Sequence, residues 1–360
     1  MKNRKNQVSL LVMLALMGIT AFLLLKDQSL SALADTIRNV NPLYLVLGFA
    51  LMLVFVGSEA AASKMALHAM GHRVRYRRCF SYSGTGFYFS SITPSATGGQ
   101  PAQVYYMAQD GIPAAHGTLD MLLITVCYQV VTLVYAALAW LLGGEVATRL
   151  GTGLGVLLGF GGTTMLLLTA MILLFMFRPT AANRLAGWAL RLGVKIHLIR
   201  DETKAQNALA HQMEEYRSGA QLLKNRPLLF PAMLGMTFVQ MTALYLVPYV
   251  VYRAFGLSGG SAVAIVATQA LVTLAVSCLP LPGAVGASEA GFVQAFTLFF
   301  GAGLVTPAML LSRGITFYGF LLLAAGITIY VHLRTRKRAT LTAVSVPEDE
   351  LRADKSEQVA

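Results

Sequence analysis

Charged residues and cysteines are scarce in this sequence, and each shortage excludes a class of protein. Only 12% of the 360 residues are Asp, Glu, Lys or Arg, against about 25% in an ordinary soluble domain, so a water-soluble fold is excluded. Cys79, Cys127 and Cys278 are isolated, with no C-x-x-C pair, and predict neither a disulfide framework nor a zinc site. Hydrophobic residues make up 56% of the chain, and the mean hydropathy is +0.62. These values indicate an integral membrane protein.

Apolar runs long enough to cross a bilayer, about 20 residues each, recur along the chain. The first run, 8–25, follows three basic residues but has no small-residue cleavage site after it, so we interpret it as a retained span rather than a signal peptide. The other strong runs are 42–62, 118–142, 152–177, 228–251, 261–279 and 307–333. They predict an all-α polytopic membrane protein with about 7–8 transmembrane helices in one integral domain, residues 1–338. The polar tail 339–360 is expected to be disordered.

The positive charges predict the orientation. Of the 28 basic residues, 23 lie in the N-terminus, in 64–78, in 178–226 and in the tail from Arg334. The positive-inside rule places these segments, and therefore both termini, on the cytoplasmic side of a bacterial or archaeal cell membrane. The net charge of +12 then favours anionic lipid as a partner, and nucleic acid is not expected. Within the loop 178–226, residues 178–200 fit either a basic interfacial helix or a solvated linker.

Two segments rich in Pro and Gly interrupt the apolar pattern. The stretch 80–106 must begin and end on the cytoplasmic side, and its middle contains two prolines and a Gly-Gly pair, so it predicts a re-entrant hairpin. A second break, 279–291, has the same character and leads into the apolar run 292–300. If it also forms a hairpin, the two units are inverted copies, as in many transporters. Two simple crossings through 261–303 are the alternative.

Polar side chains in the breaks are candidates for binding a lipid head group. The first break offers hydroxyls and amides, and its two glycine amides are suited to an anion-binding concavity. Its candidate residues are Thr93, Ser95, Thr97, Gly98, Gly99, Gln100 and Gln103. The candidates of the second break are Pro282, Gly283, Gly286 and Glu289, with Arg313 from the last span. The alternative for the hydroxyls is that they only satisfy the broken backbone.

Charges inside spans are rare and are functional candidates by default. Glu289 and Arg313 either form an ion pair or leave Arg313 to receive a lipid phosphate, for which its forked guanidinium is suited. A helix-start cap for Glu289 and snorkelling of Arg313 to the interface are the structural alternatives. Glu59 is a weaker candidate, because its position near Lys64 fits the cytoplasmic rim.

The two breaks together carry a family resemblance. The segments ITPSATGGQP (92–101) and PGAVGASE (282–289) resemble the lysylphosphatidylglycerol synthase transmembrane-region family of flippase-like membrane proteins, and the likeness covers roughly residues 8–335. The resemblance implies a membrane region that carries lysylphosphatidylglycerol between leaflets, a process linked to resistance against cationic peptides and antibiotics. In longer members a cytosolic domain makes this lipid from lysyl-tRNA. The family commonly has an acidic residue where this chain has Gln100, so a polyprenyl-phosphate or other glycolipid carrier is equally compatible.

These observations favour a lipid translocase that acts on a phospholipid such as lysylphosphatidylglycerol or on a polyprenyl-phosphate-linked lipid. No cofactor, metal site or nucleotide-binding motif is expected. A first alternative is phosphatidylglycerol lysyltransferase activity, which would need a separate synthase domain, because the loop 178–226 and the tail have no room for one. A second alternative is a membrane scaffold for a synthase or glycosyltransferase. An enzymatic activity of this chain alone is not expected.

Overall fold

The computed structural model describes residues 40–142, 151–177, 225–277 and 281–344, with the single residues 38, 207, 210, 214, 221 and 279. All regular structure in this part of the chain is helical, which confirms the all-α membrane fold. Five of its helical segments are long and apolar enough to cross a membrane. The predicted span 8–25, the segment 178–200 and Cys278 lie outside the described residues.

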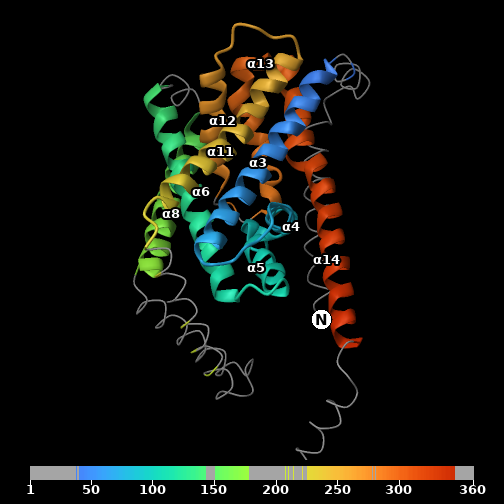
Figure 1. Cartoon of the computed structure of the whole chain (residues 1–360). Helices are drawn as coiled ribbons and strands as arrows, with labels where there is room; N and C mark the ends of the chain where they lie inside the picture. Colours follow the sequence, from blue (N-terminus) through green and yellow to red (C-terminus); the bar gives the residue numbers. More distant parts are fainter. Residues whose placement is uncertain are drawn as a thin grey trace, which may run out of the picture.

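The helices follow one another in an order that repeats once (Figure 1). The first group is α3 (Pro42–Ala69), α4 (Tyr76–Ile92), η1 (Pro94–Ala96), α5 (Gly99–Gln109) and α6 (Ala114–Leu142). After α8 (Gly151–Phe177), the second group is α11 (Leu229–Ala254), α12 (Ala262–Val276), η2 (Pro282–Ala284), α13 (Ala287–Arg313), η3 (Gly314–Gly319) and α14 (Phe320–Val344). Since α14 extends to Val344, residues 339–344 of the predicted disordered tail are helical.

The two breaks have nearly the same backbone conformation. In each, an extended residue precedes a proline that opens a short 3-10 turn, and the next two residues have positive φ. These are Ser95 (51°) and Ala96 (55°) in the first break, and Gly283 (58°) and Ala284 (50°) in the second. Proline has no amide hydrogen to continue a helix, and positive φ turns the chain sharply, so both helices end here. The turns η1 and η2 contact each other.

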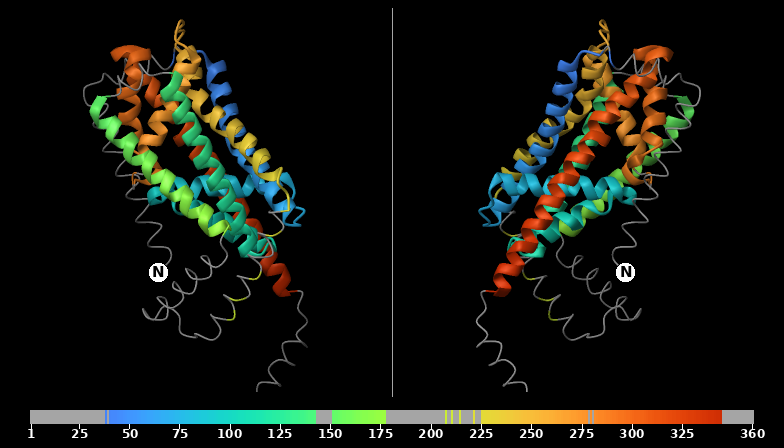
Figure 2. Two further views of the ribbon diagram at one scale, coloured as in Figure 1. Left: turned by 90° about the vertical axis from the view of Figure 1, so that its left-hand side faces the viewer. Right: turned by 90° about the vertical axis from the view of Figure 1, so that its right-hand side faces the viewer.

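The two groups run in opposite directions through the bundle. In Figure 1, α3 descends, α4 and α5 lie in the lower half, and α6 rises. By contrast α11 rises, α12 and the first part of α13 lie in the upper half, and the chain then descends through α14, as Figure 2 also shows. The segment 261–303 is therefore a hairpin and not two crossings, and its second arm ends at Gly301, where φ is 70°. The described helices have the predicted inverted arrangement.

The helices divide their side chains between the core and the surroundings as a lipid-embedded bundle requires. Large apolar side chains such as Leu43, Leu141 and Leu322 are exposed on the outside, as expected where lipid replaces water. The buried face of α3 consists largely of small residues and packs closely on α11. Small residues let two helix backbones approach, which supplies the packing energy available inside a membrane.

One end of the bundle carries the arginine-rich turn between α3 and α4, and we call it the basic end. Here Asp110, just after α5, lies 3.5 Å from both Arg78 of α4 and Arg334 of α14. The hydroxyl of Tyr82 donates to the same carboxylate at 2.6 Å. These contacts connect the first hairpin to the last helix.

Candidate functional site

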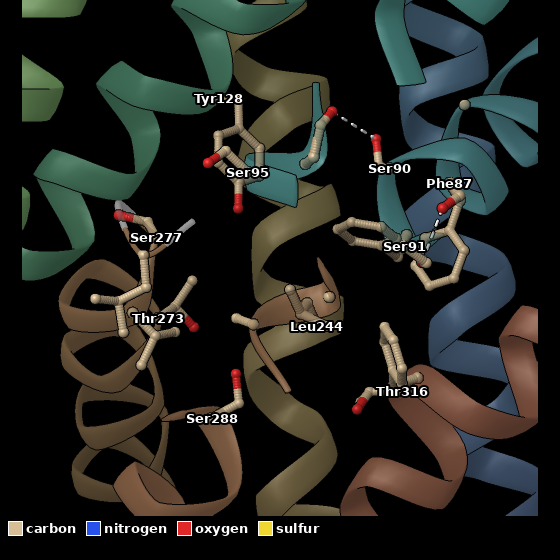
Figure 3. A pocket seen from close by; sticks show the side chains of 18 of the residues that line it. Phe87, Ser90, Ser91, Ser95, Tyr128, Leu244, Thr273, Ser277, Ser288 and Thr316 are labelled. Carbon is tan, nitrogen blue, oxygen red and sulfur yellow. Dashed lines mark hydrogen bonds between the residues drawn. The ribbon is translucent and has the colours of Figure 1, made fainter. Parts of the chain in front are cut away.

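A cavity of about 630 Å³ lies where the two breaks meet. Its walls come from α3, α4, α5, α6, α8, α11, α12, α13 and both 3-10 turns, with the π-helical turn η3. In Figure 3, Ser95 and Tyr128 face it from one side, Ser277 from a second, and Ser288 and Thr316 from below. A cavity with a mostly apolar wall and several hydroxyl and amide groups suits an amphipathic ligand better than a small ion.

Arg313 and Glu289 form the ion pair that the sequence left open. Arg313 Nε donates to Glu289 Oε1 at 2.8 Å, and one terminal nitrogen donates to the carbonyl of Gly283 at 3.2 Å. The guanidinium carbon lies 4.4 Å from the ring centre of Phe317. A guanidinium has five N–H donors, of which Glu289, Gly283 and the Tyr318 hydroxyl engage part, so the remaining donors of Arg313, which lines the cavity, are available to an anion.

Glu289 acts as a fixed support for Arg313. It is buried, its Oε2 accepts the Gly286 amide at 2.7 Å, and Oε1 also accepts the Tyr318 hydroxyl at 3.0 Å. The Gly286 contact is the helix-start cap considered as an alternative, so both interpretations of Glu289 hold together. The π-helical turn η3 begins directly after Arg313 and brings Phe317 and Tyr318 around its side chain. Such turns are frequent at functional sites.

The candidates of the first break divide into cavity-lining and supporting residues. Ser95, Thr97, Gln100 and Gln103 line the cavity, as do Gly283 and Arg313 of the second group. Thr93, Gly98, Gly99, Pro282, Gly286 and Glu289 are not among the lining residues. Half of the site residues predicted from the sequence therefore line the cavity.

Thr93 holds the first turn together. Its hydroxyl donates to the Phe89 carbonyl at 2.6 Å and accepts the Gly98 amide at 2.9 Å. The Gly98 amide is therefore occupied, and a Cβ on Gly99 would lie 2.0 Å from the Ser90 hydroxyl oxygen. In this conformation the Gly98 amide is engaged within the turn, and Gly99 allows close packing against α4.

We expect Thr93→Val to destabilise the protein by about 1–3 kcal/mol, because it leaves the Gly98 amide without its acceptor. Thr93→Ser keeps the hydroxyl and should remain close to wild type. Thermal unfolding of both variants in detergent measures the difference. A Thr93→Val variant as stable as Thr93→Ser would show that the hydroxyl does not hold the turn.

Glu59 is placed differently from the sequence interpretation. It lines the cavity rather than the rim, and its two carboxylate oxygens accept hydrogen bonds from Gln103 and Gln240, each at 3.2 Å. Gln240 of α11 was not predicted, nor was Asp120, a fully buried carboxylate of α6. Their signal in the sequence is a polar side chain within an apolar run, which is costly unless it has a role.

The geometry defines a class of protein: a polytopic helical membrane protein with a cavity between two inverted, broken hairpins. The sequence comparison agrees and is more specific. The family described as the lysylphosphatidylglycerol synthase TM region matches residues 7–324, so the chain belongs to that family. It is also similar to a UPF0104 membrane protein of Archaeoglobus fulgidus, with 22% identity over 286 residues that cover 79% of this chain and 85% of the relative.

Proposed function

We propose that this protein is a translocase for a lipid with an anionic head group, either a phospholipid or a polyprenyl-phosphate-linked lipid. Arg313 is the observation that carries the proposal. It presents free N–H donors to a large cavity inside an apolar bundle, at the level where both hairpins turn. A phosphate accepts such donors in a forked geometry. The surrounding hydroxyls and amides suit the polar remainder of a head group.

The inverted hairpins suggest how the lipid site could open to each side of the membrane in turn. Inverted repeats allow one unit to rock against the other, so that a central site opens to either side in turn. The turns η1 and η2 contact each other at the cavity, where the two units would move against each other. The basic end would face the cytoplasm of a bacterial or archaeal cell, with both termini on that side.

The first test is a leaflet assay in proteoliposomes with fluorescent phosphatidylglycerol, lysylphosphatidylglycerol and a polyprenyl-phosphate analogue. Arg313→Lys keeps the positive charge beside Glu289 but loses the forked pair of N–H donors that would bind phosphate. Each hydrogen bond to a charged group contributes about 1.5–3 kcal/mol. We therefore expect transport of the preferred lipid to fall roughly tenfold or more. Arg253→Lys is the matched control, because Arg253 is exposed in the last turn of α11 and does not line the cavity.

Absence of transport for every lipid by the folded wild-type protein would count against a translocase. It would favour the second candidate, which accords with the family description: the membrane part of a lysylphosphatidylglycerol synthase system. That candidate predicts lysyl transfer to phosphatidylglycerol only when a synthase domain is added. A scaffold for a glycosyltransferase predicts co-purification of that enzyme without either activity.

A further inference from the structure

Glu59 is an acidic group in the cavity without a cationic partner among the described residues. Gln103 of α5 and Gln240 of α11 donate to its oxygens, and both amides are neutral. The arginine in the same cavity is already paired with Glu289. A carboxylate in an apolar interior is stable when a cation compensates it, and otherwise it takes up a proton.

A second carboxylate lies beside the first. Asp120 of α6 is fully buried, and the Ser63 hydroxyl donates to its Oδ2. Ser63 is four residues after Glu59 on α3, so both lie on one helix face about 5–6 Å apart. The Glu59 charge acts electrostatically on Asp120. Asp120 is therefore one helical turn closer to the basic end, where α3 finishes at Ala69.

Buried oxygens without a partner surround the two acids. They are Asp120 Oδ1 and Gln103 Oε1, and the hydroxyl of Ser83 of α4 faces Glu59 beside them. Buried polar atoms are rarely unpaired in proteins, and those that lack a protein partner commonly bind ordered water. One such atom belongs to Asp120 and the other to the amide that donates to Glu59, so ordered water bound at both would bring a proton path close to each acid.

The remaining neighbours supply no compensating charge at the cavity. Tyr128 of α6 also faces Glu59, while the side chains that reach Glu59 from α4, α5 and α11 are neutral. On the side of the basic end, Asp120 faces Cys79 of α4, and the exposed Lys64 lies near that thiol. Among the described residues, the pair thus faces neutral side chains toward the cavity, while Lys64 lies on the side of the basic end.

We propose that Glu59 and Asp120 form a proton-carrying site that couples movement of the anionic lipid to the transmembrane proton gradient. The coupling rests on the proposed translocase function. An anionic head group at Arg313 disfavours a second negative charge in the same cavity, so it promotes protonation of Glu59. By linkage, protonated Glu59 binds the anion better than ionised Glu59. Lipid and proton would move together, with Asp120 exchanging the proton toward the basic end.

The first experiment requires no cargo. Infrared difference spectra of the protein in lipid, recorded during a pH titration, detect the carbonyl stretch of a protonated carboxyl group. We expect this band to persist at neutral pH in wild type and to weaken in both Glu59→Gln and Asp120→Asn. Asp110→Asn is the matched control, because Asp110 does not line the cavity and is paired with Arg78 and Arg334. No protonated carboxyl at neutral pH, or a band unchanged in both test variants, would overturn the proposal.

The second experiment measures coupling in proteoliposomes that carry a pH gradient. At one proton per lipid, a gradient of one pH unit should shift the distribution of the lipid about tenfold, and Glu59→Gln should abolish this shift. Lipid transport that does not change with the pH gradient would support the translocase function and refute proton coupling. A distribution that follows a sodium gradient instead would assign the site to Na⁺. No lipid movement at all would refute the translocase, while the infrared result still decides whether the acids hold a proton.

Discussion

Replacing Glu289 by alanine should destabilise the protein by about 3–5 kcal/mol, because it leaves the charge of Arg313 buried without its partner. The exposed fractions of the two side chains are 2% for Glu289 and 13% for Arg313, so most of the ion pair is removed from bulk water. The variant also loses the acceptor of the Gly286 amide and of the Tyr318 hydroxyl. Chemical denaturation in detergent micelles measures the change in the free energy of unfolding.

A double variant separates the charge from the lost contacts. Adding Arg313→Met to Glu289→Ala removes the uncompensated guanidinium, so stability should recover in part, as seen generally when both members of a buried pair become apolar. The coupling energy from the complete mutant cycle then measures the pair itself. A single variant as stable as wild type would mean that the pair does not exist in the membrane.

The sequence predicted the breaks because their cause is local. Pro94 and Pro282 cannot donate a helical hydrogen bond, and in the second break Gly283 also adopts positive φ without a side-chain penalty. Glu289 and Arg313 were found for a similar reason, since a charge within an apolar run is conspicuous. The two residues are 24 positions apart in the chain, but Arg313 Nε lies 2.8 Å from Glu289 Oε1. They meet because the hairpin brings the end of α13 back past its first turn.

The environment of Glu59 could not be predicted, because its partners come from distant helices. Gln240 is 181 residues away along the chain, and only the packing of α3 against α11 brings the two side chains together. Asp120 has the same explanation, since Ser63 reaches it from α3. From the sequence, Glu59 was expected at the cytoplasmic rim because Lys64 follows it closely. The helix α3 continues past Lys64 to Ala69, so Glu59 lies in the interior of the bundle.

Hydropathy alone could not decide whether residues 261–303 form a hairpin or two crossings, because the answer depends on the backbone turns. Residues 261–279 are apolar enough and long enough to cross, but α12 ends at Val276 and the chain turns back through η2. The deciding residue is Gly301, whose positive φ ends the second arm before the descending helix begins. A run of apolar residues sets how deep a segment can lie, and the backbone turns decide where it reverses.

Gly283→Ala should destabilise the second hairpin by about 2–5 kcal/mol, from a left-handed backbone costing about 1–2 kcal/mol and overpacking costing about 1–3 kcal/mol. Its φ is +58°, and a Cβ would lie 2.2 Å from Cζ and 2.4 Å from Cε2 of Phe317. The Arg313 guanidinium packs over the face of the Phe317 ring. A shift of the ring therefore moves the group proposed to bind phosphate, so lipid transport should fall together with stability.

Two further variants divide this effect into its causes. Gly326→Ala, on α14, adds the same methyl group where no other atom lies within 4 Å, so it should be neutral. Adding Phe317→Leu to Gly283→Ala should recover the steric part of the loss but not the backbone strain. Denaturation and leaflet assays on the same samples compare stability with transport. If Gly283→Ala behaves like Gly326→Ala in both, the turn at η2 does not hold Phe317 and Arg313 in the arrangement on which the proposed phosphate site depends.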